Sequence, residues 1–174
     1  MSRVKKFASL AAVAVAVPLA LATSAGPAGA VVGPGHLWND SNSVNQCVAA
    51  SGNHHNAQVI MWNCDAEAGQ SWQNYMHYDA TAGQIKNGNG DCLDETSQSE
   101  GSNIYAMTCM TGGDLTEQLW DFVSVRGTTY VELVNRSSGM CLSVAGGSTA
   151  NGSRVIAWKC QGTLDQLWGG PAID

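Results

Sequence analysis

The amino-acid sequence predicts an all-β domain built from three repeats, and three tryptophans mark them. A glutamine stands two positions before a tryptophan in "GQSW", "EQLW" and "DQLW", and these tryptophans, Trp72, Trp120 and Trp168, are 48 residues apart. Short β-prone stretches, such as 130–135 and 155–158, alternate with turns rich in Gly, Ser and Asn. Such alternation is typical of an all-β barrel or sandwich. Beyond the N-terminal segment, no long stretch has the periodicity of an α-helix.

The three repeats share one order of elements and align over residues 36–72, 83–120 and 130–168. Each begins with a β-prone stretch and a turn that leads to a first cysteine. A loop rich in Gly, Ser and Asn follows, then an apolar stretch to a second cysteine, and then a loop to Gln-x-Trp. We expect about four short strands per repeat, which bury a common core only when the repeats stack around a pseudo-threefold axis.

Six cysteines accompany this pattern, and an even number in an exported chain predicts disulfides. Within each repeat the two cysteines are separated by 17, 17 and 19 residues respectively. Because the arrangement occurs three times in the same order, we expect one bridge inside each repeat, and each closed loop contributes about 3 kcal/mol in the chain-entropy model. The predicted bridges are Cys47–Cys64, Cys92–Cys109 and Cys141–Cys160.

The first thirty residues have the features of an export signal. Arg3, Lys5 and Lys6 are followed by an apolar stretch at 7–22, and small residues precede the expected cleavage after Ala30. The apolar stretch is shorter than the about 20 residues of a membrane-spanning helix. We therefore expect residues 1–30 to be a signal peptide and residues 31–174 to be a secreted, extracellular chain.

Residues 31–174 suit a single domain with a workable core. They carry five Lys and Arg, scattered along the chain, against fourteen Asp and Glu. Binding to nucleic acid or to anionic lipid depends on clustered basic residues. We therefore expect neither nucleic acid nor a membrane as a partner.

The threefold Gln-x-Trp with paired cysteines resembles the ricin B-type lectin domains, a group that includes R-type lectins and family-13 carbohydrate-binding modules. The resemblance covers nearly all of residues 31–174 and implies a β-trefoil with pseudo-threefold symmetry, one disulfide in each repeat, and repeats at about 33–80, 81–126 and 127–174. In this family the tryptophans of Gln-x-Trp are chiefly core residues, and each ring buries about 150–250 Å². An amide has two donors and an acceptor oxygen, so the glutamines can pin the loop backbone or reach a ligand. These glutamines are Gln70, Gln118 and Gln166.

The resemblance also implies where a sugar would bind. The family pattern has an Asp two residues after the first cysteine, an aromatic residue two before the second, and an Asn just before the Gln of Gln-x-Trp. The matching residues are Ala49, Trp62 and Gly69 in the first repeat, Asp94, Met107 and Glu117 in the second, and Ser143, Trp158 and Asp165 in the third. No repeat keeps all three parts of the pattern.

The third repeat keeps the most complete set. Trp158 can stack on a sugar ring, Ser143 can exchange one hydrogen bond, and Asp165 can accept one. The first repeat keeps the ring of Trp62 without the carboxylate, and the second keeps Asp94 without the ring. A hydrogen bond to a charged group is worth about 1.5–3 kcal/mol, so each loss weakens a site. The competing interpretation is structural, with both rings packed on their own loops and Asp94 forming a turn.

These features predict a secreted, non-catalytic, monomeric carbohydrate-binding protein. Binding would be weak and multivalent, on galactose-type or plant or microbial polysaccharide glycans. The sequence has no hydrolase, metalloprotease or phosphate-binding motif, so we expect no enzymatic activity and no cofactor. His54 and His55 lie in a polar loop, which favours solvated side chains over a metal site. The alternative is a secreted β-trefoil interaction protein or protease inhibitor with degenerate sugar sites, whose partner is a secreted protein.

Overall fold

The computed structural model describes residues 35–40, 46–65, 68–77 and 82–170. The expected signal peptide and its cleavage point lie outside the described residues. Within the described ranges, no helix has the length and apolar character that a membrane crossing requires.

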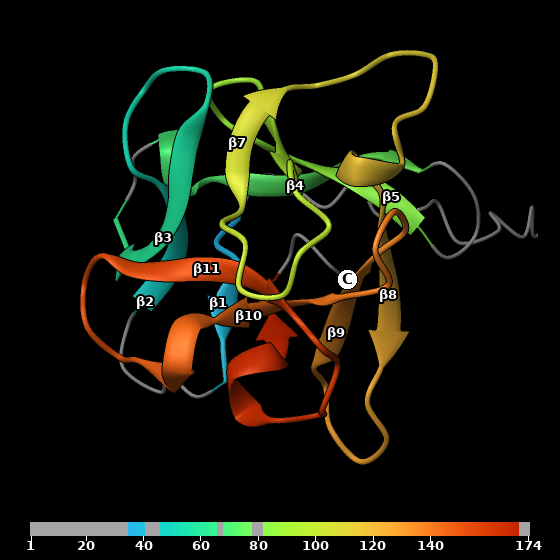
Figure 1. The fold of residues 1–174 in the computed structure, drawn as a ribbon. Coiled ribbons are helices and arrows are strands. Elements are labelled where there is room, and N and C mark those ends of the chain that lie inside the picture. Colours follow the sequence, from blue (N-terminus) through green and yellow to red (C-terminus); the bar gives the residue numbers. More distant parts are fainter. Residues whose placement is uncertain (1–34, 41–45, 66–67, 78–81, 171–174) are drawn as a thin grey trace, which may run out of the picture. The chain divides into compact units, whose positions relative to one another are not determined.

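The regular secondary structure of the described chain consists of short strands, four in each repeat as the sequence predicts, and four short 3₁₀ turns (Figure 1). The first repeat contains β1 (Trp38–Asn39), β2 (Gln46–Ala50), β3 (Ala57–Asn63) and β4 (Trp72–His77). The second contains β5 (Ala82–Asn87), β6 (Asp91–Asp94), β7 (Tyr105–Thr108) and β8 (Trp120–Ser124). The third contains β9 (Val131–Asn135), β10 (Cys141–Val144), β11 (Ser153–Trp158) and β12 (Trp168–Gly169). Four short 3₁₀ turns complete the fold: η1 (Ala68–Gln70), η2 (Thr116–Gln118), η3 (Ala145–Gly147) and η4 (Leu164–Gln166).

The strand pairing repeats three times. In each repeat the second and third strands form an antiparallel hairpin, β2–β3, β6–β7 and β10–β11. The last strand of each repeat pairs with the first strand of another, β4 with β5, β8 with β9 and β12 with β1. The hairpins also meet one another, because β3 pairs with both β7 and β11, and an isolated bridge joins Asn103 to Ile156 of β11. This threefold arrangement of hairpins is a β-trefoil.

The three tryptophans of Gln-x-Trp lie at the centre of the core, as the resemblance implies. Trp72, Trp120 and Trp168 have no exposed surface. Each indole N–H donates to the backbone carbonyl of the residue after the first cysteine of its repeat, at 2.9–3.1 Å. A buried indole needs such an acceptor, so each ring fixes the start of its own hairpin. The acceptors are Val48, Leu93 and Leu142.

The three predicted disulfides are confirmed as Cys47–Cys64, Cys92–Cys109 and Cys141–Cys160. Each bridge joins the second strand of its repeat to the segment just after the third strand.

Candidate functional site

The glutamines of Gln-x-Trp form hydrogen bonds with the backbone on both sides of each second cysteine. In the third repeat the Gln166 side chain accepts from the N–H of Gln161 and donates to the carbonyl of Lys159, both at 2.7 Å. In the first repeat Gln70 makes the same two bonds, with Asp65 and Asn63, at 2.8 Å.

Gln118 does the same in the second repeat, with the N–H of Met110 at 2.8 Å and the carbonyl of Thr108 at 3.0 Å. Gln118 and Gln166 have no exposed surface, and Gln70 is 3% exposed. In each amide, the oxygen accepts from a backbone N–H and the nitrogen donates to a backbone carbonyl. The sequence left two roles open for these glutamines, and the structure supports the one in which they hold the loop backbone in place. We therefore leave Gln118 and Gln166 out of the proposed ligand contacts.

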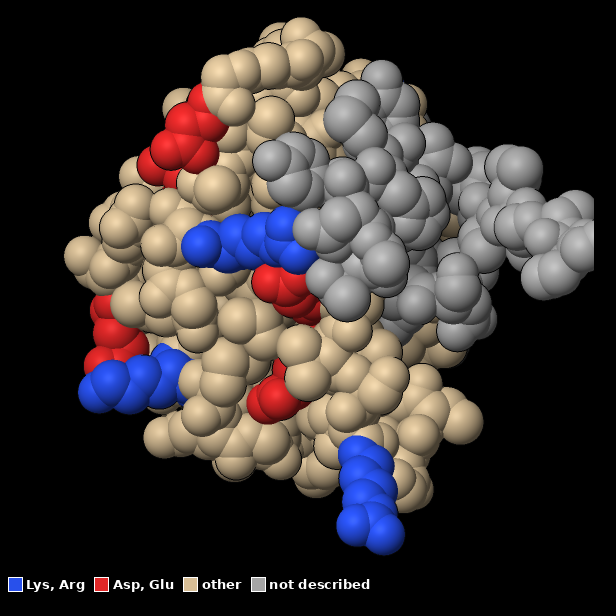
Figure 2. Space-filling model, turned by 90° about the vertical axis from the view of Figure 1, so that its right-hand side faces the viewer, with Lys and Arg blue, Asp and Glu red and all other residues tan. Residues whose placement is uncertain are grey.

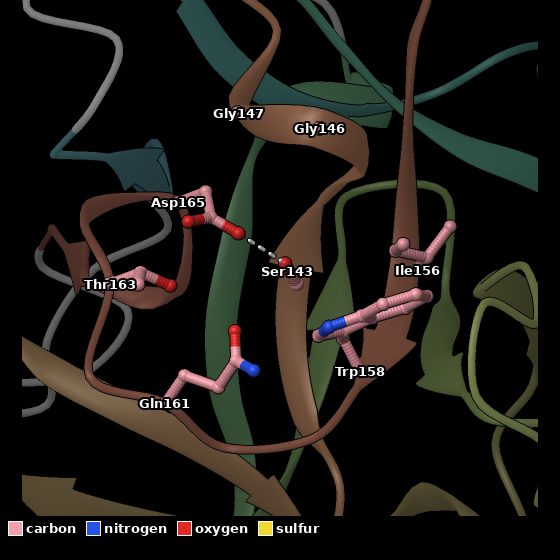
Figure 3. A pocket seen from close by; sticks show the side chains of 8 residues that line it. All are labelled: Ser143, Gly146, Gly147, Ile156, Trp158, Gln161, Thr163 and Asp165. Atoms are coloured by element: carbon pink, nitrogen blue, oxygen red, sulfur yellow. Dashed lines mark hydrogen bonds between the residues drawn. The ribbon is translucent and has the colours of Figure 1, made fainter.

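A cavity of about 380 Å³ lies beside η4 in the third repeat (Figure 3). This volume is within the range of small-molecule sites. Strand β10 provides Ser143, β11 provides Ile156 and Trp158, and η4 provides Asp165. The structure thus brings together the three residues that the sequence predicts for the third repeat.

The polar side of this cavity is a hydrogen-bonded pair. Ser143 donates its hydroxyl to Oδ2 of Asp165 at 2.6 Å. Ser143 is 2% exposed and forms the floor. Because its proton points at Asp165, the Ser143 oxygen has only acceptor capacity left, and the ionised carboxylate is also an acceptor. The pair therefore favours a ligand that donates hydrogen bonds.

Trp158 forms the apolar side of the same cavity. Its side chain is 37% exposed, and in Figure 3 it lies on the opposite side of Ser143 from Asp165. Large apolar side chains are usually buried. An exposed tryptophan ring in a cavity that also contains a carboxylate therefore indicates a surface for a ligand.

The sequence argument missed two exposed residues of the rim, Gln161 and Thr163, and two glycines of η3 that also line the cavity, Gly146 and Gly147. Gln161 and Thr163 are exposed and line the cavity from the loop between the second cysteine and η4. The Gln-x-Trp motif is the sequence signal that could have identified them. Gln166 accepts a hydrogen bond from the N–H of Gln161 and so fixes the course of this loop.

The sequence has eight Lys and Arg residues. On the face drawn in Figure 2, the Lys and Arg side chains lie apart from one another. Near the third cavity, Lys159 lies 3.4 Å from a carboxylate oxygen of Glu100. In the part of the chain that the structure describes, no three His, Cys, Asp or Glu side chains group in a way that could hold a metal ion.

The first repeat has a similar cavity of about 310 Å³. Trp62 lines it and is 43% exposed. Ala49 occupies the position that Ser143 takes in the third repeat, so this position has no polar group. Asp65, a residue that the sequence argument passed over, lines this cavity from the loop, and Gln70 lies at its edge.

The second repeat is arranged differently. Asp94 is 2% exposed and accepts a hydrogen bond from the Gln118 amide at 2.8 Å. Burial raises the pKa of Asp94, an effect that the bond from Gln118 opposes. Met107 stands where the other repeats have tryptophan. The structure places Asp94 inside the scaffold, and we leave it out of the proposed site.

Next to Asp94, the Glu95 side chain is also buried, with no exposed surface. It accepts a hydrogen bond from the Ser138 hydroxyl at 2.6 Å. Burial raises the pKa of Glu95 to about 7, the Ser138 bond lowers it, and the nearby carboxylates of Glu117 and Asp94 raise it further. The sequence gives no sign of this burial, because Glu95 lies at the edge of a polar stretch.

Known structures share this architecture. A designed threefold-symmetric protein, ThreeFoil, is similar with a TM-score of 0.71 and 25% identity over 80% of this chain and 97% of its own. An exo-β-1,3-galactanase from Clostridium thermocellum is similar with a TM-score of 0.67 and 23% identity over 78% of this chain, which spans only 29% of the galactanase. The lectin of Polyporus squamosus has a TM-score of 0.64 and 18% identity, over 79% of this chain and 48% of the lectin.

Among curated proteins, none gives a significant sequence match. The profile of the ricin-type beta-trefoil lectin domain, in contrast, matches residues 34–168, which include all three Gln-x-Trp motifs and all six cysteines. The chain belongs to the ricin-type beta-trefoil lectin domain family.

Proposed function

We propose that residues 31–174 form a secreted, non-catalytic carbohydrate-binding protein whose principal site is in the third repeat. The observation that carries the proposal is the cavity in which the exposed ring of Trp158 lies with the Ser143–Asp165 pair. Two proteins of similar fold support a sugar as the ligand. The Polyporus squamosus lectin is described with a sialylated galactose epitope, and the C-half of an earthworm R-type lectin is described with GalNAc.

The chemistry of the cavity matches the two sides of a hexose. A hexose has an apolar face of C–H groups, which stacks on Trp158, and a rim of hydroxyls, which donate to Asp165 and to the Ser143 oxygen. The Gln161 amide at the rim adds donors for ring or hydroxyl oxygens.

The ligand that fits is neutral. Among the described residues that line the cavity, none is Lys or Arg, so an anionic sugar would meet the Asp165 carboxylate without a compensating cation. Galactose-type glycans and neutral plant or microbial polysaccharides are the class that we propose.

Binding at one site is weak, and the first repeat adds a second contact. Its cavity offers the ring of Trp62 with the Asp65 carboxylate nearby, but it has Ala49 in place of the Ser143 hydroxyl. Two weak sites on one rigid body gain avidity on a polymer that can reach both. Polysaccharides are therefore expected to bind more tightly than single sugars.

A glycan array followed by retention on immobilised polysaccharide tests the proposal. The wild-type chain is compared with Trp158→Ala, with Trp158→Phe, which keeps an aromatic ring, and with Val123→Ala as a control at a 43% exposed apolar residue of β8. We expect retention to fall for Trp158→Ala, to be partly kept for Trp158→Phe, and to be unchanged for Val123→Ala. Equal retention with and without Trp158 would contradict the proposal.

The same protein can be offered a mixture of secreted proteases. Capture of a protease that survives Trp158→Ala, together with no retention on any glycan, would replace carbohydrate binding with the interaction or inhibitor function.

A further inference from the structure

The exposed tryptophan of each cavity lies against a glycine from a different repeat. Gly101, in the loop between β6 and β7, lies beside Trp158, and a Cβ atom placed on it would be 3.4 Å from Cζ3 of the ring. Gly152, in the loop before β11, lies beside Trp62, with a corresponding distance of 3.9 Å. A loop of the second repeat therefore lies next to the ring of the third, and a loop of the third repeat lies next to the ring of the first.

Equivalent backbone hydrogen bonds fix both contacts. The N–H of Gly101 donates to the carbonyl of Ala157, and the N–H of Gly152 donates to the carbonyl of Met61, each at 2.8 Å. In both cases the acceptor belongs to the residue just before the tryptophan. The bond therefore holds the glycine next to the ring.

Both positions require glycine for conformational reasons as well. Gly101 has a φ of +84° and Gly152 a φ of +83°, in a region that residues with a side chain rarely adopt. Neither glycine lines the cavity of the tryptophan that it touches. Each supports its ring from outside the cavity and leaves the cavity side open.

The second repeat provides an internal comparison. At the equivalent position, the N–H of Asn56 donates to the carbonyl of Ala106 at 2.8 Å. Asn56 has a φ of 65°, and the residue after Ala106 is Met107, not tryptophan. Where the aromatic ring is missing, the supporting glycine is missing too, although the backbone bond is kept.

We propose that Gly101 and Gly152 are positioning residues that set the orientation of Trp158 and Trp62, so that each site is shared by two neighbouring repeats. The inference rests on the proposed carbohydrate binding. A methyl group at Gly101 would lie in van der Waals contact with the edge of the Trp158 ring, at 3.4 Å from Cζ3. The ring would then pack against this methyl group instead of the bare backbone of the loop, and we expect its stacking surface to turn relative to the Ser143–Asp165 pair.

The test compares Gly101→Ala with Gly127→Ala. Gly127 has the same φ of +84°, but no atom lies within 4 Å of the position that its Cβ would take. Both substitutions strain the backbone in the same way, and only Gly101→Ala adds a contact with a ring. Two quantities are measured for each: the NMR signal of the Trp158 indole N–H, assigned with Trp158→Phe, and the affinity for the polysaccharide that retains the wild type.

We expect the Trp158 signal to shift and the affinity to fall by about two- to tenfold, the scale of a partly lost aromatic contact, in Gly101→Ala alone. An unchanged signal, a shifted signal with unchanged affinity, or an equal loss in Gly127→Ala would overturn the inference. If Gly101→Ala does not fold, Gly101→Asn replaces it, because Asn56 has a left-handed backbone at the equivalent position. If the wild type binds no polysaccharide, the proposed function fails, and the indole signal alone decides whether Gly101 positions the ring.

Discussion

Ser143 and Asp165 lie 22 residues apart in the sequence, and a hydrogen bond of 2.6 Å joins their side chains on one side of the third cavity. The bond links strand β10 to the turn η4 and orients both oxygen atoms toward the same space (Figure 3). Ser143 stands at the position where the family pattern has an aspartate. Its hydroxyl provides the hydrogen-bonding group there, and Asp165 of η4 provides the negative charge.

Replacing Asp165 with Ala should weaken glycan binding by about ten- to a hundredfold, because a hydrogen bond to a charged group is worth about 1.5–3 kcal/mol. Ser143→Ala should have a smaller effect, since it removes a neutral acceptor. The measurement is isothermal titration with a retained oligosaccharide. Asp114→Ala is the control, an exposed carboxylate in the corresponding loop of the second repeat. An affinity as strong for Asp165→Ala as for Asp114→Ala would remove Asp165 from the site.

Replacing Gln166 with Leu should lower the free energy of unfolding by about 1–3 kcal/mol, because the backbone groups of Lys159 and Gln161 lose their partner. Denaturant titration measures the change. Gln98→Leu is the control, an exposed glutamine bonded only to the Ser137 hydroxyl, and it should change stability by no more than about 0.5 kcal/mol. Full stability in Gln166→Leu would show that the glutamine does not pin the loop.

Removing the third disulfide with the double change Cys141→Ala and Cys160→Ala should lower the free energy of unfolding by about 3 kcal/mol, the value for a loop of this length. The bridge closes 19 residues of separation and spans the hairpin that carries Ser143 and Trp158. We therefore expect glycan affinity to fall as well at temperatures near the midpoint of unfolding. The measurement is thermal unfolding. A midpoint of unfolding in the double variant equal to that of the wild type would contradict a stabilising role of this disulfide.

Glu95 makes stability depend on pH. Its folded pKa of about 7 is above the ordinary value of 4.5, so the folded state holds the proton more tightly than the unfolded state. The stabilisation is complete below pH 4.5 and is lost as pH rises to about 7, by an amount on the order of 2–3 kcal/mol. The raised pKa of Asp94 acts in the same direction.

Glu95→Gln should therefore be more stable than the wild type at pH 8 and should show a smaller loss of stability between pH 5 and pH 8. Unfolding by denaturant at the two pH values measures both effects. Glu100→Gln, at an exposed glutamate that pairs with Lys159, should keep the wild-type dependence. An identical pH dependence in Glu95→Gln would show that this carboxyl group is ionised in the folded protein at all these pH values.

The fold could be predicted from the sequence because its signals occur three times. One Gln-x-Trp is weak, but three at equal spacing, each with its cysteine pair, specify the repeats, the buried tryptophans and the disulfides, and the structure confirms all three. The resemblance to the family pattern also implied that Ser143, Trp158 and Asp165 belong together, and in the structure all three line one cavity.

The remaining features depend on contacts between repeats, which spacing within a repeat does not reveal. The position of Gly101 beside Trp158 is set by how the β6–β7 loop crosses onto β11. The burial of Asp94 and Glu95 depends on Gln118 and Ser138, which come from η2 and from the turn after β9. The sequence argument considered Asp94 as a sugar ligand or a turn residue, and it gave no indication that Asp94 and Glu95 are buried.

The most direct test of the account is the affinity of Trp158→Ala relative to Trp62→Ala for one neutral oligosaccharide that the wild type binds. Both rings are exposed to a similar degree, 37% and 43%, but the cavity of Trp158 has the bonded pair of Ser143 and Asp165, and the cavity of Trp62 has Ala49 at the position of Ser143. We predict that Trp158→Ala loses most of the binding and that Trp62→Ala loses little. Equal losses, or a larger loss in Trp62→Ala, would contradict the assignment of the principal site to the third repeat.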